Sequence, residues 1–137
     1  MKLYLAAPSH LQEDMKLLRK GLNAHRITVT SRWIDLDFSL VPEEEYGAHA
    51  QWDFDDIDDA HFVILYNPKA VHKTGTGGRH VETGYALAKG IPIVYIGEVD
   101  ENVFHHHPGV RAMIRTTKIK GLAEQIVITL LNFREGK

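Results

Sequence analysis

Continuous apolar runs and amphipathic stretches alternate along the chain. The apolar runs predict three strands buried on both faces, at residues 2–7, 61–66 and 91–96. β-branched residues within 26–33 and a short run near 112–116 predict two more strands. Helical spacing and helix-end signals predict helices between them, from a cap at Ser9 to Leu22, from Pro42 to Ala60, from Arg79 to Lys89 and from Gly121 to Phe133.

The order of these elements indicates the fold class. Strands that alternate with helices over short connections are typical of a parallel sheet with helices on both faces. We therefore expect an α/β, doubly wound, flavodoxin-like sheet of five strands. The length of 137 residues favours one domain, 1–137.

Composition removes several classes of function. The chain has no cysteine, which excludes disulfides, thiolate metal sites and a cysteine nucleophile. Its net charge of −2, without a cluster of basic residues, argues against a nucleic-acid polymer as partner. The apolar N-terminal run ends at Pro8 and is too short for a signal peptide or a membrane span, so we expect a cytoplasmic protein with no membrane partner.

The predicted topology places the ligand site at the carboxyl ends of the strands. Three loops converge there: the loop after the first strand, the glycine loop after Tyr66 and the polar loop after Ile96. The residues expected to contact substrate in these loops are Ala6, Ala7, Pro8, Ser9, Gly77, Gly78, Arg79 and His107.

Two carboxylates are candidates for catalysis. Glu82 falls in the predicted first turn of the helix at 79–89, where free N–H groups and the helix dipole favour an ionised side chain. By position alone, a glutamate that only caps this helix is the commoner case. Asp53 shares a helix face with Ile57 and Ala60, which favours burial. The neighbouring aspartates are expected to face solvent, and they are Asp55, Asp56, Asp58 and Asp59.

Other features carry weaker signals. A tyrosine such as Tyr4 within a buried strand is more often a core residue than a catalytic one. The run His105–His107 is not expected to bind metal, because consecutive residues do not easily direct three rings to one ion. The segment 75–78 does not fit a phosphate loop, because Arg79 and His80 stand where a lysine and a hydroxyl should follow.

The segment 78–93, GRHVETGYALAKGIPI, resembles the glutamate-bearing helix and following strand of the nucleoside 2-deoxyribosyltransferase family, which includes the 2′-deoxynucleoside 5′-monophosphate N-hydrolases. The resemblance implies that Glu82 is the sugar-attacking nucleophile. The segment 3–7 is similar to the family's first strand and places Tyr4 at its active-site tyrosine. Asp53 lies eight residues before His61, which is similar to the spacing of the second catalytic carboxylate.

Two departures from the family pattern keep its branches open. Thr76 stands where the transferases often carry an aspartate, and Pro8-Ser9-His10 replaces the Arg-Gly-Gly of the hydrolases. Deoxyribosyl transfer between bases is the leading hypothesis, N-hydrolysis of a nucleotide is the alternative, and a non-catalytic nucleotide-binding or signalling module is the third. The resemblance implies no cofactor or metal, a nucleoside or nucleotide and a free base as small-molecule partners, and a homo-oligomer with shared active sites.

Overall fold

A computed structural model describes residues 1–68, 77–98, 102–116 and 118–134 of the chain. Within them a five-stranded sheet has the order β2-β1-β3-β4-β5, and every neighbouring pair is parallel. The strands are β1 (Lys2–Ala6), β2 (Thr28–Val29), β3 (Phe62–Tyr66), β4 (Ile93–Ile96) and β5 (Val110–Ile114). The predicted doubly wound, flavodoxin-like sheet is confirmed.

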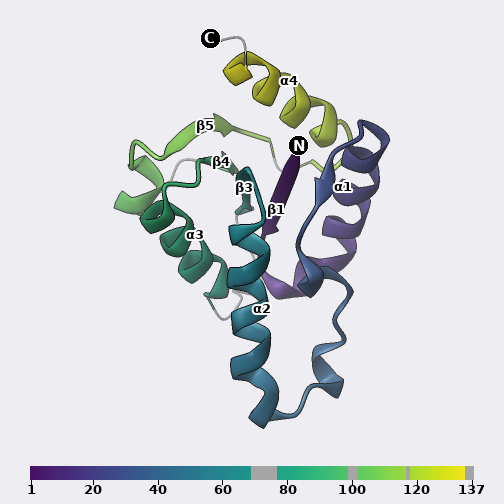
Figure 1. Ribbon diagram of the computed structural model, residues 1–137. Helices are drawn as coiled ribbons and strands as arrows, with labels where there is room; N and C mark the ends of the chain where they lie inside the picture. Colours follow the sequence, from purple (N-terminus) through teal and green to yellow (C-terminus); the bar gives the residue numbers. More distant parts are fainter. Residues whose placement is uncertain (69–76, 99–101, 117, 135–137) are drawn as a thin grey trace.

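Helices cover both faces of the sheet. In Figure 1, α1 lies beside α4 on one side, and α2 lies beside α3 on the other. Their bounds are α1 (Gln12–Ala24), α2 (Tyr46–Asp58), α3 (Gly78–Lys89) and α4 (Leu122–Arg134). None of the helices in the described ranges is both long and apolar enough to cross a membrane.

The strand predicted within 26–33 is shorter than expected. The last backbone bond of the ladder is donated by the Thr30 N–H to the Leu3 carbonyl at 2.9 Å. Side chains take over beyond it: the Leu5 N–H donates to Ser31 Oγ at 2.6 Å, and the Trp33 indole N–H donates to the Leu5 carbonyl at 2.8 Å. The chain then forms a 3-10 turn at Arg32–Asp35. β1 therefore pairs with the backbone of β2 over its first half and with side chains at Leu5.

Two predicted helix starts are wrong. Ser9 does not cap α1, because a 3-10 turn at Ser9–Leu11 comes first and Leu11 precedes the α-helix without a capping side chain. The helix expected from Pro42 starts as a 3-10 turn at Glu43–Glu45 and becomes α-helical at Tyr46. In both places a tight turn satisfies the first backbone groups, so the sequence signal marks the turn rather than the helix.

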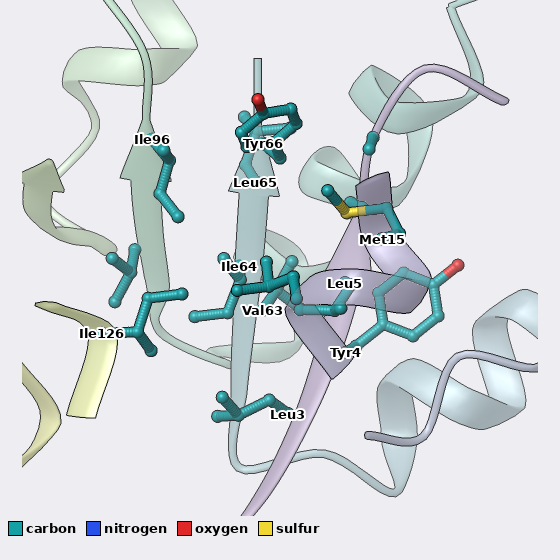
Figure 2. Close-up of a cluster of buried hydrophobic side chains, with 14 of the residues drawn as sticks. Leu3, Tyr4, Leu5, Met15, Val63, Ile64, Leu65, Tyr66, Ile96 and Ile126 are labelled. Atoms are coloured by element: carbon teal, nitrogen blue, oxygen red, sulfur yellow. The ribbon is translucent and has the colours of Figure 1, made fainter. Parts of the chain in front are cut away.

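The core lies on both sides of the central strands. Figure 2 shows side chains of β1, β3 and β4 packed together with Met15 of α1 and Ile126 of α4. Successive side chains of a strand point to opposite faces. Tyr4 consequently faces α3 rather than α1, and its side chain is fully buried there.

Candidate active site

The start of α3 sets the position of Glu82. Gly77 precedes the helix in a left-handed conformation with φ of 88°, which a glycine adopts without steric cost. The helix begins at Gly78, so Glu82 lies in its second turn. The prediction that Glu82 occupies the first turn is wrong, because the glycines start the helix earlier than the residue pattern indicates. Glu82 is therefore too far along α3 to cap the first N–H groups of the helix.

Glu82 is half-buried, and Tyr4 holds its side chain. The Tyr4 hydroxyl donates a hydrogen bond to Glu82 Oε2 across the interface of β1 and α3. Burial raises the pKa of Glu82 to about 8, the Tyr4 hydrogen bond acts against this rise, and the nearby Asp53 adds to it. Burial also raises the pKa of Tyr4 well above its ordinary value, so its hydroxyl stays a donor. The sequence predicts that the helix dipole keeps Glu82 ionised. In the structure, desolvation instead raises the pKa of Glu82 and favours its protonated form.

Asp53 forms the second carboxyl group of the site. It is half-buried on α2, and burial followed by the charge of Asp56 raises its pKa to about 6, while Arg32 acts in the opposite direction. Between these two pKa values the pair Glu82 and Asp53 holds one proton. One carboxylate and one carboxylic acid are therefore present together at neutral pH.

Asp56 is the exception among the aspartates expected to face solvent. It is buried, whereas Asp55, Asp58 and Asp59 are exposed as predicted. Its carboxylate accepts from the Arg32 backbone N–H at 3.0 Å and from Arg32 Nε at 3.0 and 3.1 Å. The chain after β2 folds against α2, and this contact covers a helix face that looks solvated in the sequence.

A cavity of about 140 Å³ opens at the carboxyl ends of β1 and β3. Most residues predicted to form the site converge on it. Its lining consists of Ala7, Pro8, Ser9, Trp33, Phe38, Asp53, Gly77, Gly78, Arg79 and Glu82.

Three predicted site residues lie outside this lining. Tyr4 is behind the cavity and reaches it through Glu82, and Ala6 is fully buried at the end of β1. His107 is exposed after the 3-10 turn Val103–His106, where its Nδ1 accepts from the Gly109 N–H at 2.9 Å. His107 therefore stays an untested expectation, and Thr76 falls outside the described residues.

A larger aromatic recess of about 410 Å³ adjoins the first cavity and shares Ser9, Trp33, Phe38 and Asp53 with it. Its wall continues over Trp52, whose ring lies 4.6 Å from the Arg32 guanidinium carbon. Together the two spaces are of the size usual for small-molecule sites, roughly 300–1,000 Å³. The residue pattern did not indicate these aromatic residues, although Trp33 ends the second predicted strand range and Phe38 follows it, at the same edge of the sheet.

The parts of the chain that the structure describes contain no group of three or more His, Cys, Asp or Glu side chains placed to hold a metal ion.

Comparison with solved structures gives a likeness over nearly the whole chain. The CMP N-glycosidase BcmB of Clostridium botulinum has a TM-score of 0.63 to this chain. The match covers 93% of this chain and 99% of that one, at 19% sequence identity. This chain has the fold of that N-glycosidase. The family resemblance stated from the sequence is supported at the level of the fold.

A second solved structure shares the fold more loosely. A 3-dehydroquinate dehydratase-like protein from Bifidobacterium longum has a TM-score of 0.50, 13% identity and coverage of 93% of this chain and 94% of its own. No protein-family model and no curated protein sequence matches the chain. One fold hosts many activities, so the residues of the site rather than the fold determine the function.

Proposed function

We propose that the protein cleaves the N-glycosidic bond of nucleosides or nucleotides, with Glu82 as the nucleophile. One observation carries this proposal: a half-buried glutamate, hydrogen-bonded by Tyr4, shares a cavity with a second carboxyl group on Asp53. Paired carboxyl groups, one acidic and one ionised, are what retaining glycosidic cleavage requires. The fold shared with a CMP N-glycosidase supports the same class of reaction.

The first step forms a glycosyl ester. A Glu82 carboxylate oxygen attacks the anomeric carbon, the bond from that carbon to the base nitrogen breaks, and its electron pair goes to the base. Because the pKa of Glu82 is the higher of the two, the shared proton lies mainly on Glu82, and the reactive form is the minor state in which this proton has moved to Asp53. The Asp53 carboxyl group then gives this proton to the departing base, which leaves neutral. Tyr4 donates to the other oxygen of Glu82 and keeps the attacking oxygen oriented.

The second step releases the sugar. An acceptor, either water or a second base, attacks the anomeric carbon while the Asp53 carboxylate takes the acceptor's proton. The ester bond breaks, and its electron pair returns to Glu82. Two inversions at the same carbon give net retention.

The two adjoining spaces suit the two parts of the substrate. The smaller cavity contains Glu82 and therefore takes the sugar, and the recess lined by Trp33 and Trp52 takes the base. Aromatic rings offer flat apolar faces to a nucleobase, and stacking of this kind contributes about 1–3 kcal/mol per base. Asp53 lines both spaces, which supports a role for it at the bond between base and sugar.

The identity of the acceptor separates transfer from hydrolysis. The family resemblance of the sequence favours transfer to another base, with hydrolysis as the alternative. Incubation with each deoxynucleoside and deoxynucleotide, with and without a free acceptor base, decides between them. A new nucleoside demonstrates transfer, and free sugar or sugar phosphate demonstrates hydrolysis.

The nucleophile is tested by trapping it. A 2-fluoro-2-deoxy substrate slows breakdown of the ester, so a glycosyl adduct should accumulate on the peptide that carries Glu82 in mass spectrometry. Glu82→Ala should be folded and inactive, Tyr4→Phe should lose less activity, and the exposed Glu45→Ala should behave like the wild type. Near-normal turnover in Glu82→Ala, or an adduct on another carboxylate, would overturn the assignment. Binding of nucleotides without any turnover would favour a non-catalytic module.

A further inference from the structure

The aromatic recess beside the smaller cavity contains polar side chains as well as rings. It extends along the face of α2 that carries Asp53, and His49 lies one helical turn before Asp53 on that face. Figure 1 shows the start of α2 reaching beyond the strands, so His49 is farther from the sheet than Asp53. A substrate that extends outward from the carboxyl pair therefore meets His49 next.

The ring of His49 is held by Trp52. The two rings pack edge to face, with centroids 4.5 Å apart and planes at 73°. His49 Nδ1 is buried and has no hydrogen-bond partner among the described residues. Because a buried N–H without an acceptor is rare in proteins, the proton of the neutral ring is on Nε2. His49 lines the recess, so this Nε2–H is the group that it offers to a ligand there.

The guanidinium of Arg32 is a second donor of the recess. Its central carbon lies 4.6 Å from the centre of the Trp52 ring, and it lines the same space as His49. An ion pair with Asp56 at 3.0 Å holds it there. A guanidinium donates hydrogen bonds and accepts none. The outer part of the recess thus offers donors from both side chains.

The spacing along α2 fits a nucleobase. With Asp53 at the bond between base and sugar, as the proposed function requires, His49 lies about one helical turn, ~5.4 Å, further out. The far edge of the base falls at this level, and nucleobases differ at this edge. Hypoxanthine, guanine, uracil and thymine have a carbonyl oxygen there, whereas adenine and cytosine have an amino group.

We propose that His49 determines the base preference of the enzyme, because its Nε2–H donates to the carbonyl oxygen at the far edge of an oxo base. This inference rests on the proposed function of the same site and specifies its substrate class. An amino group at that edge would place two donors against each other. The ring cannot relieve this by moving its proton, since the proton would then lie on the buried Nδ1 without an acceptor. Oxo bases are therefore preferred over amino bases.

The test compares substrates that differ at this edge. The pairs are 2′-deoxyinosine with 2′-deoxyadenosine and 2′-deoxyuridine with 2′-deoxycytidine, each as nucleoside and as 5′-monophosphate. In every pair that is cleaved, the wild type should have a kcat/KM for the oxo member that is higher on the order of 10- to 100-fold. His49→Phe keeps a ring beside Trp52 but has no N–H, so the preference should be lost. His49→Gln can turn its amide to donate or accept and should cleave both members.

The matched control is His25→Phe. His25 follows α1, lies 3.8 Å from Glu124 and lines neither of the two spaces. This variant should keep the preference of the wild type. Circular dichroism shows whether each variant is folded, and the comparison of oxo and amino substrates in the wild type decides by itself if a His49 variant does not fold.

Two results would overturn the inference while leaving N-glycosidic cleavage intact. One is a wild type that cleaves amino substrates as well as oxo substrates or better. The other is a folded His49→Phe variant that keeps the full preference, which would assign it to another donor. If no substrate is cleaved, calorimetry with the free bases hypoxanthine, adenine, uracil and cytosine still decides. Tighter binding of the oxo bases that is lost in His49→Phe supports the inference, and equal binding or none refutes it.

Discussion

At the scale of single residues, the protonation of Glu82 and Asp53 governs the proposed chemistry. Below about pH 6 both groups are protonated and no nucleophile exists, and above about pH 8 both are ionised and no acid is left for the base. We expect kcat/KM to follow a bell-shaped pH profile with limbs near these two values. Initial rates between pH 4.5 and 9.5 would measure it. A rate that stays constant from pH 5 to 9 would contradict the carboxyl pair.

The desolvated Glu82 should make the protein less stable as pH rises. Its pKa in the folded state, about 8, is above the ordinary 4.5, so the native protein keeps a proton that the unfolded chain has lost. Stability from this group is full below about pH 4.5 and declines as pH rises through 8. Glu82→Gln has no such proton and can still accept from Tyr4. At pH 8 the free energy of unfolding of Glu82→Gln, measured in urea, should therefore exceed that of the wild type by up to about 4 kcal/mol. At pH 4.5 the two free energies should be similar.

A matched control for this comparison is Glu45→Gln, which alters an exposed glutamate of the 3-10 turn before α2. It should unfold like the wild type at both pH values. A Glu82→Gln variant whose advantage is the same at pH 4.5 and 8 would show that Glu82 is not buried as a protonated acid.

Substitutions of Asp53 and Asp56 should affect different properties, the reaction rate and the stability of the fold. Asp53→Asn should lower the rate by about 10²–10⁴-fold with little loss of stability, since it removes general acid–base assistance from the cavity. Asp56→Asn removes the charged partner of Arg32 and should destabilise the fold by about 1–3 kcal/mol, a value reduced because Arg32 is half exposed. Turnover per folded molecule and urea unfolding separate these outcomes. Equal rate losses in the two variants would remove the distinction.

At the scale of the elements, the end of β4 is packed tightly against the end of β3. Gly97 has a φ of 145°, and a Cβ added there would lie 2.4 Å from the Asn67 carbonyl oxygen. Gly97→Ala should therefore destabilise the protein by about 2 kcal/mol or more and disturb the Asn67 that holds Arg79. Thermal unfolding measures the first effect.

Gly47 in α2 provides the opposite case. Nothing lies within 4 Å of a Cβ added there, and helices favour alanine over glycine. Gly47→Ala should stabilise the fold by roughly 0.5–1 kcal/mol. A Gly97→Ala variant as stable as Gly47→Ala would show that the strand ends are more loosely packed than described.

The sequence pattern was sufficient to predict some strands and not others. The buried strands β1, β3 and β4 were predictable because they are covered on both faces and read as continuous apolar runs. β2 was overestimated because its neighbours in sequence bond through Ser31 and Trp33 side chains. Bonds between residues more than 20 positions apart leave no local trace in the pattern.

At the scale of the whole molecule, apolar side chains are exposed beside the site. Val81, Val103 and Phe104 have exposed fractions of 61%, 72% and 64%, and Val81 and Phe104 border a hollow of about 480 Å³ between α3 and the turn Val103–His106. Exposed apolar patches often mark protein interfaces. The predicted homo-oligomer should therefore use this surface.

Sedimentation equilibrium should give a mass that is a multiple of 15.5 kDa. The double change Val81→Asp and Phe104→Asp should lower that mass and the activity together, because subunits with shared sites lose function when they separate. Leu131→Asp, on the exposed face of α4, is the control and should leave both unchanged. A monomeric and fully active wild type would refute the shared-site expectation.

The sequence by itself determined the order of strands and helices, the parallel sheet and the edge where the site lies, because hydrophobic periodicity and chain connectivity act locally. It also singled out Glu82, Asp53 and Tyr4. Only the tertiary structure decided which side chains are desolvated and which are paired. The desolvation of Glu82, the burial of Asp56, the aromatic recess around Trp33 and the hydrogen bond from Arg79 to Asn67 depend on contacts between distant segments. Burial and charge pairing set the pKa values and the available hydrogen bonds, and they arise only when those segments meet.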